Sequence, residues 1–204
     1  MKHLFPILLM LSALLCSCGE KEDILPEQQT KFISYLTTTH VPKLVSEREK
    51  NAAQEKNLEY YTTAGDSTYR YIVDIYNVDR EQKAQVEYGD SLSLTFRMYV
   101  FAFKDIVTKG DKIDMPYYTN DPLLELPMID VGLTPGWVFE PLDIKLGTTP
   151  ILKGLEIALP GCREGDVVEL YMSYNMAYGS ADFGLVPKKS PVAILFTVVK
   201  VKKN

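Results

Sequence analysis

The side chains that most often carry metal or nucleophilic chemistry are scarce in this sequence. It has 2 histidines, 3 cysteines and 1 tryptophan among 204 residues. Cys16 and Cys18 lie at the end of an apolar N-terminus, which leaves His40 and Cys162 for a folded domain. A single histidine excludes a histidine-rich metal cluster and argues against a Ser-His or Cys-His triad. Cys162, next to Gly161 in a predicted turn, is interpreted as a small, half-buried residue. We therefore expect no metal and no cofactor.

Positive charge is also not concentrated anywhere along the chain. The sequence carries 22 Lys and Arg residues against 27 Asp and Glu residues, for a net charge of −5. Proteins that bind nucleic acids usually show a basic stripe or patch, and none is visible here. We expect no nucleic-acid partner.

Long hydrophobic runs are absent apart from residues 4–15. A run of about a dozen residues has the length of a signal-peptide core and is too short for a membrane-spanning helix. It ends in Leu15-Cys16-Ser17-Cys18, which resembles the lipobox of bacterial lipoproteins. Cys18 fits the lipidated position better than Cys16, because bulky leucines precede Cys16 where small side chains are needed. The alternative is an ordinary secretory signal with two incidental cysteines.

The N-terminus therefore predicts an exported protein held on the outer membrane, at its periplasmic face or at the cell surface, by a lipid anchor on Cys18. Residues 1–17 would be the signal peptide and residues 18–24 a charged tether, which resembles those of Bacteroidetes surface lipoproteins. Removing residues 1–17 takes away one charged side chain, Lys2, and moves the net charge from −5 to −6. With Cys18 acylated, Cys162 is the last thiol, so no intrachain disulfide is possible.

Residues 25–58 are predicted to form a helical extension. Pro26 suits the first turn of a helix, and apolar residues recur at helical spacing from Phe32 to Leu36. The Val41-Pro42 pair ends that helix. Residues 44–58 are charged and contain alanine and glutamate, which favours a solvated helix.

Beyond residue 59 the pattern is that of strands around one short helix. Alternating residues predict strands over 69–76, 91–100 and 167–174, and the apolar segment 191–201 is predicted to be the closing strand. Residues 153–159 are predicted to be helical, and Pro160-Gly161 ends that helix. This order predicts an α+β fold with an antiparallel sheet curled over the helix.

A series of short motifs lies along this region in a specific order. The motifs are Gly89-Asp90, Leu146-Gly147, Ile151-Leu152-Lys153-Gly154-Leu155-Glu156, Leu159-Pro160-Gly161-Cys162-Arg163-Glu164-Gly165-Asp166, Ala177-Tyr178-Gly179, Val186-Pro187 and Ser190-Pro191. Together they resemble the FKBP family of peptidyl-prolyl cis-trans isomerases over residues 89–201. The resemblance implies an FKBP-like domain over residues 59–204, with residues 25–58 as the N-terminal extension that many exported members carry.

The implied activity is rotation about Xaa-Pro bonds in proline-containing polypeptide chains. This rotation crosses a barrier of roughly 18–20 kcal/mol and takes tens of seconds unaided. A dry apolar cup favours the twisted amide, which has lost its resonance, over the ground state that water solvates well. Such catalysis needs no nucleophile, metal or cofactor.

The resemblance also implies which residues form the cup. Tyr178 matches a tyrosine whose hydroxyl donates to a substrate carbonyl, and Leu152 matches a position whose backbone N–H donates. The implied substrate-binding wall consists of Phe96, Tyr117, Leu142, Ile151, Leu155, Leu185, Val186 and Ile194.

Two substitutions separate this sequence from the family pattern. Tyr118 replaces an aspartate that accepts a hydrogen bond in the pocket, and Leu155 replaces the tryptophan under the prolyl ring. The 103–140 loop is also longer than usual, and we interpret its Trp137 as a packed loop aromatic; the alternative is that it folds over the pocket.

Three function classes remain open at this stage. The first is a weak isomerase that acts as a folding helper of the cell envelope. The others are a non-catalytic binding module and a structural lipoprotein that docks through its N-terminal helices.

Overall fold

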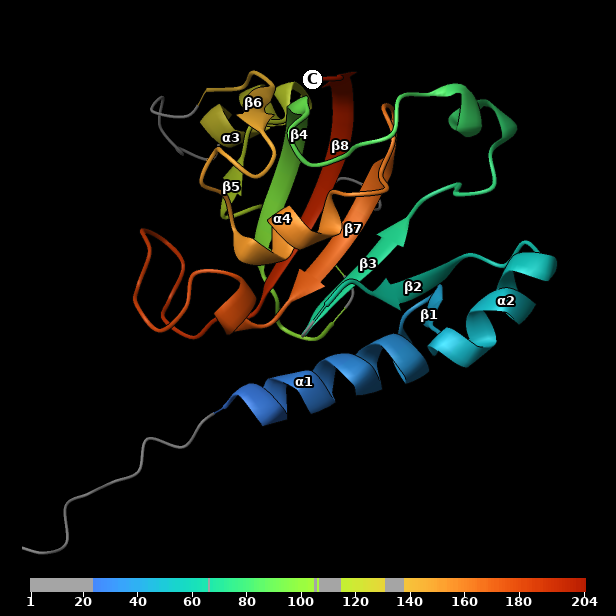
Figure 1. The fold of residues 1–204 in the computed structure, drawn as a ribbon. Coiled ribbons are helices and arrows are strands. Elements are labelled where there is room, and N and C mark those ends of the chain that lie inside the picture. The colour runs from blue at the N-terminus through green and yellow to red at the C-terminus, as the bar shows by residue number, and fades with distance from the viewer. Residues whose placement is uncertain (1–23, 66, 105, 107–114, 131–137) are drawn as a thin grey trace, which may run out of the picture.

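The computed structural model describes residues 24–65, 67–104, 106, 115–130 and 138–204 (Figure 1). The predicted signal peptide, Cys18, all but the last residue of the tether, and Trp137 lie outside this part of the chain.

The described residues contain an eight-stranded sheet with the order β1-β2-β3-β7-β8-β4-β5, and β6 pairs with β4 beside this path. Only the β1–β2 pair is parallel. The strands are β1 (Lys43–Leu44), β2 (Tyr60–Thr63), β3 (Thr68–Ile72), β4 (Ser91–Val100), β5 (Tyr118–Thr119), β6 (Leu142–Lys145), β7 (Val167–Met172) and β8 (Val192–Lys202). The predicted α+β class and the largely antiparallel, curled sheet are confirmed.

The helices lie on both sides of this sheet. They are α1 (Leu25–Ser34), which continues into the π-helical turn η1 (Tyr35–Thr39), α2 (Glu47–Glu55), α3 (Glu125–Asp130) and α4 (Lys153–Ala158), with short 3-10 turns η2 (Val78–Gln82), η3 (Pro122–Leu124) and η4 (Tyr174–Met176). In Figure 1, α4 lies across the middle of the sheet, and α1 runs along its lower end. Among the described residues, no helix is long and apolar enough to cross a membrane.

Strand alternation divides the buried side chains into two clusters. On the face that α4 covers, called here the α4 face, the cluster is mostly aliphatic and includes Leu94, Leu170 and Phe196. On the other face, called here the α1 face, the neighbouring strand residues pack instead against Phe32 and Leu36 of the extension. Phe32 and Leu36 are both fully buried there, so the extension completes the core of the domain.

Several predicted boundaries need correction. The strand predicted over 69–76 ends at Ile72, and the one predicted to residue 174 ends at Met172. The helix predicted over 44–58 is confined to α2, because the Ser46 and Glu49 side chains form a capping box at its start, three residues after the end of β1. Since β1 pairs with β2, the 25–58 segment contributes a strand as well as helices.

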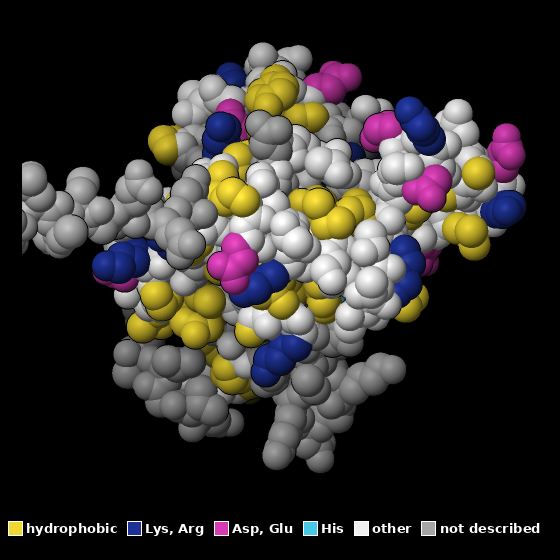
Figure 2. Space-filling model, turned by 90° about the horizontal axis from the view of Figure 1, so that it is seen from below, with side chains coloured by type: hydrophobic (Ala, Val, Ile, Leu, Met, Phe, Trp, Pro, Cys, Tyr) yellow, Lys and Arg dark blue, Asp and Glu magenta, His cyan; other side chains and the backbone are white. Residues whose placement is uncertain are grey.

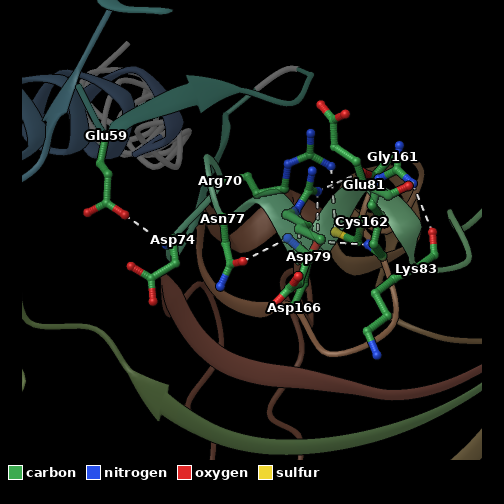
Figure 3. Close-up of polar contacts among 12 residues, drawn as sticks. Glu59, Arg70, Asp74, Asn77, Asp79, Glu81, Lys83, Gly161, Cys162 and Asp166 are labelled. Atoms are coloured by element: carbon green, nitrogen blue, oxygen red, sulfur yellow. Dashed lines mark hydrogen bonds and ion pairs between the residues drawn. The ribbon is translucent and has the colours of Figure 1, made fainter. Parts of the chain in front are cut away.

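Arginine side chains gather at the turn that follows α4, where Figure 3 shows Arg70 near Cys162. Arg70 Nη1 donates to the carbonyl oxygens of Ala158 at 2.6 Å and Pro160 at 2.8 Å. A cation there complements the negative end of the helix dipole. Nearby, Arg80 makes two 2.8 Å bonds to the buried Asp166 carboxylate, on the turn that leads into β7.

Cys162 lies within this arginine cluster and is fully buried. Burial raises the pKa of its thiol to about 11, although Arg70 and Arg80 act in the opposite direction. Since the thiolate is the reactive form, this environment disfavours reactivity. Cys162 is a small packing residue, but it is fully buried and not half-buried as predicted.

Candidate functional site

The candidate site lies where the N-terminal end of α4 meets the segment that follows β7. Gly154 of α4 is buried against β7, and a Cβ at this position would lie 2.8 Å from Met172 Sδ and 3.2 Å from the Met176 carbonyl oxygen. Only glycine permits this close approach. Residues 174–189 are called here the site segment. The close approach of Gly154 to Met176 brings Ile151 and Leu152, just before α4, toward this segment.

Seven of the ten residues predicted for the site belong to one apolar cluster. Leu155, Val186 and Ile194 are buried in it. The other four are only partly buried and pack on its rim: Phe96, Ile151, Leu152 and Tyr178. The structure therefore brings an apolar floor and half-open walls together on the α4 face. Their roles as substrate contacts stay predictions.

The remaining three predicted residues are more exposed. Tyr117, Leu142 and Leu185 expose 37%, 42% and 54% of their surface. Leu142 lines a hollow of about 370 Å³ beside Phe96 and Tyr118, between β5 and β6. Tyr117 and Leu185 take no part in the cluster among the described residues.

Tyr178 is placed as a neutral hydrogen-bond donor. Burial raises the pKa of its phenol, and the neighbouring Tyr118 raises it further. Its ring stacks on Phe183 with a centroid distance of 4.5 Å and an interplanar angle of 18°. A phenol that keeps its proton in an apolar setting can donate to a carbonyl oxygen at any physiological pH.

The second predicted donor, the Leu152 N–H, lies at the N-cap of α4. Within the described part of the chain this N–H has no hydrogen-bond acceptor, whereas the Leu152 carbonyl accepts from Glu156 N–H at 2.9 Å. A backbone donor therefore remains at the rim next to Ile151.

Tyr118, not Tyr117, is the aromatic residue of β5 that faces the site, so the assignment of the inward ring to Tyr117 needs correction. The β4–β5 register pairs Tyr118 with Met98, which is buried on the α4 face. Because side chains alternate along a strand, Tyr117 then points to the other side. The Tyr118 ring meets Phe183 edge-on, with centroids 6.3 Å apart.

The Tyr118 hydroxyl also holds the tip of the site segment, because it accepts the Leu185 N–H at 3.0 Å. This tip is a tight turn in which Phe183 and Val186 exchange two backbone hydrogen bonds of 2.9 Å. Gly184 in the turn has φ +54°, and a Cβ there would overlap the Tyr118 hydroxyl. Glycine is required for both reasons.

Sequence reasoning missed Phe183 as a member of the site, and it named Tyr118 only as the substitute for a pocket aspartate, not as the aromatic residue that faces the site. Two residues of β5 are too few to show an alternating pattern, and Phe183 lies in a turn without any regular spacing. The Phe-Gly pair was the one available signal, since a glycine after an aromatic residue is compatible with a tight turn.

The α4-face cluster and its partly buried rim are called here the cup, and the Tyr178 hydroxyl and the Leu152 N–H are two neutral donors at this rim. Among the described residues, no group of three or more His, Cys, Asp and Glu side chains could hold a metal ion. Such a cup suits the binding of an uncharged, extended polypeptide segment.

Comparison with known proteins finds one family that matches part of the chain. Residues 138–199 match the family model described as FKBP-type peptidyl-prolyl cis-trans isomerase. The match spans β6, α4, β7 and most of β8, and it contains Leu152, Leu155 and Tyr178. It covers less than a third of the chain.

Among solved structures, the chain is similar to the N-terminal domain of FKBP42 from Arabidopsis thaliana. The two share 14% identity with a TM-score of 0.44, over 80% of this chain and 98% of that one. None of the curated proteins that were compared matches this sequence.

Proposed function

We propose that this protein is an FKBP-type peptidyl-prolyl cis-trans isomerase with weak activity, anchored through Cys18 as a folding helper of the cell envelope. The observation that carries the proposal is the position of Tyr178. Its neutral hydroxyl lies at the rim of an apolar cluster, within the segment that matches the isomerase family.

The proposed mechanism uses only neutral groups of this chain. A proline ring packs on the partly buried rim residues Phe96 and Ile151, above the buried Leu155, Val186 and Ile194. The Leu152 N–H and the Tyr178 hydroxyl then donate to carbonyl oxygens of the bound segment. The apolar surroundings favour the twisted amide, which is less polar than the planar one, and so lower the rotation barrier.

Three features support weak rather than strong activity. The Leu155 side chain presents less apolar surface to a prolyl ring than the indole ring of a tryptophan would. The Tyr118 hydroxyl accepts from the protein's own Leu185 N–H and so does not supply the free acceptor of a carboxylate. The Phe183 ring stacks on Tyr178 and must shift or share its surface with a substrate.

The same contacts favour a second candidate function, which is binding of proline-containing chains without catalysis. A site segment held by Tyr118 can keep an apolar cup in place without stabilising a rotating amide. The third class, a structural subunit that docks through α1, would need another surface, because Phe32, Tyr35 and Leu36 are buried against the protein's own sheet.

A protease-coupled assay on proline peptides distinguishes the first two functions. We expect a rate above background, and we expect Tyr178→Phe to lower kcat/KM about fivefold, as the loss of one hydrogen bond worth about 1 kcal/mol predicts. Tyr117→Phe is the matched control and should have no effect. If folded protein at high concentration gives only the background rate, the isomerase proposal is refuted and binding without catalysis remains.

Anchoring is tested separately by metabolic labelling with a radioactive fatty acid. Cys18→Ser should abolish incorporation and release the protein from the membrane fraction, whereas Cys16→Ser should not. Labelling that survives Cys18→Ser would contradict the anchor assignment.

A further inference from the structure

One side chain of α1 connects the N-terminal extension directly to the site segment. Gln28 is a polar residue that exposes only 6% of its surface. Its Nε2 donates to the Lys189 carbonyl oxygen at 2.7 Å, and its Oε1 accepts the Tyr174 N–H at 3.1 Å. These two partners are the ends of the site segment, which carries Tyr178.

Tyr174 and Lys189 both lie outside the strands of the sheet. β7 ends at Met172 and β8 begins at Val192, so neither the Tyr174 N–H nor the Lys189 carbonyl belongs to a strand ladder. Both hydrogen bonds to Gln28 are partly buried, and a side-chain amide can serve a donor and an acceptor at once. Gln28 therefore satisfies both ends with one group.

Further bonds close the base of the site segment around Gln28. Gly179 N–H donates to the Tyr174 carbonyl at 2.8 Å, and Lys189 N–H donates to the Gly179 carbonyl at 3.0 Å. Gly179 directly follows Tyr178 in the chain. The backbone on which Tyr178 stands is thus fixed at Tyr174, at Gly179 and, through Gln28, at Lys189.

We propose that Gln28 is a positioning residue of the site: it holds the base of the site segment so that the Tyr178 hydroxyl stays at the rim of the cup. This inference deepens the proposed isomerase function and rests on it for its effect on rate. Figure 2 shows the side of the molecule on which α1 lies, where hydrophobic side chains occur in separate groups among charged ones. The extension acts on the site from that side, without lining the cup.

The neighbouring glutamine provides a matched control. Gln29 Nε2 donates to the Ser67 hydroxyl, between β2 and β3, and makes no hydrogen bond to the site segment among the described residues. Gln28→Ala removes both bonds to the site segment. Gln28→Glu has nearly the same shape, keeps the acceptor for Tyr174 N–H, and places a carboxylate against the Lys189 carbonyl.

The experiment is amide hydrogen exchange by NMR on the full chain, combined with the peptide assay. For Gln28→Ala we expect exchange at Gly179 and Lys189 to speed up about tenfold, while the amides of β8 stay unchanged. Gln28→Glu should speed exchange at Lys189 more than at Gly179, and Gln29→Ala should change neither. In the assay, Gln28→Ala should lower kcat about fivefold and leave KM within twofold.

Exchange rates at Gly179 and Lys189 that equal those of the native protein in both Gln28 variants would overturn the proposal. So would an equal rise in Gln29→Ala, which would indicate a general loosening of α1. If Gln28→Ala does not fold, Gln28→Glu decides by the same criteria. A native protein without isomerase activity would refute the proposed function, yet the exchange comparison would still decide the role of Gln28.

Discussion

The two faces of the sheet differ in what covers them and in how completely they are covered. On the α1 face, eight of the ten buried residues in the cluster are aromatic, and the extension closes over them. On the α4 face the core is mostly aliphatic, and one short helix leaves a rim of partly buried residues around Tyr178. The α1 face is therefore a closed core, whereas the α4 face ends in an open cup.

This difference separates stability from the candidate function. A fully buried aromatic cluster contributes mainly to the free energy of folding. A half-open apolar rim costs stability and is retained where a ligand can cover it. Gln28 is the exception that joins the two, since it lies on α1 and bonds to the site segment.

The largest expected effect on stability comes from truncating Phe32, at the centre of the aromatic cluster on the α1 face. Phe32 is fully buried and contacts four rings, with the Phe103 centroid at 4.9 Å. Phe32→Ala should destabilise the protein by about 3–5 kcal/mol in denaturant unfolding. Ile33→Ala, on the same helix but 48% exposed, should cost less than about 1 kcal/mol. Equal costs would mean that α1 is not part of the core.

High pH should weaken the α1 face before the α4 face. Burial raises the pKa values of Tyr61, Tyr69 and Tyr71 on that face, and Glu169 and Glu59 raise those of Tyr61 and Tyr71 further. These tyrosines keep their protons in the folded state, whereas the unfolded chain loses them near pH 10. The stability they contribute is fully present below about pH 10 and is lost as pH rises toward their folded pKa values.

The expected result is a free energy of unfolding that is constant below about pH 10 and falls above it, with a limiting slope of about 1.4 kcal/mol per pH unit for a tyrosine that stays protonated in the folded state. Denaturant unfolding at several pH values between 8 and 11 measures it. Tyr61→Phe should reduce this slope, whereas Tyr88→Phe, at a position 59% exposed, should leave it unchanged. A flat profile to pH 11 would contradict the burial of these hydroxyls.

The turn over the cup should respond to a smaller change. Gly184→Ala forces a side chain into positive φ and against the Tyr118 hydroxyl, so we expect a loss of about 1–2 kcal/mol. Tyr118→Phe should cost about 1 kcal/mol alone, because the Leu185 N–H loses its acceptor. The double variant should cost less than the sum, since the overlap is relieved. Strict additivity would mean that Tyr118 and Gly184 are not in contact.

The sequence predicted the long elements well, for a physical reason. β4 has polar and apolar residues in alternation over most of its ten residues, β8 is an eleven-residue strand rich in apolar residues, and α4 ends where proline and glycine follow it. Such patterns are strong enough to survive tertiary context. The two residues of β5 carry no such signal, so which of Tyr117 and Tyr118 faces the cup depended on the register with β4.

The link between α1 and the site had no sequence signal at all. A glutamine on a helix is normally exposed, and the partners of Gln28 are 146 and 161 residues away. Helical spacing predicted the helix that carries Phe32 and Leu36, but not the surface that these residues cover. Long-range contacts of this kind depend on how the whole sheet curls, which no local pattern specifies.

The account is tested most directly by titrating the isotopically labelled protein with a short Xaa-Pro peptide in NMR. It predicts shifts at the amides of Ile151, Leu152 and Tyr178, no shifts at Phe32 and Tyr171 on the α1 face, and faster cis-trans exchange of the peptide. Shifts confined to the α1 face, or none at saturating peptide, would contradict the assignment of the cup as the binding site.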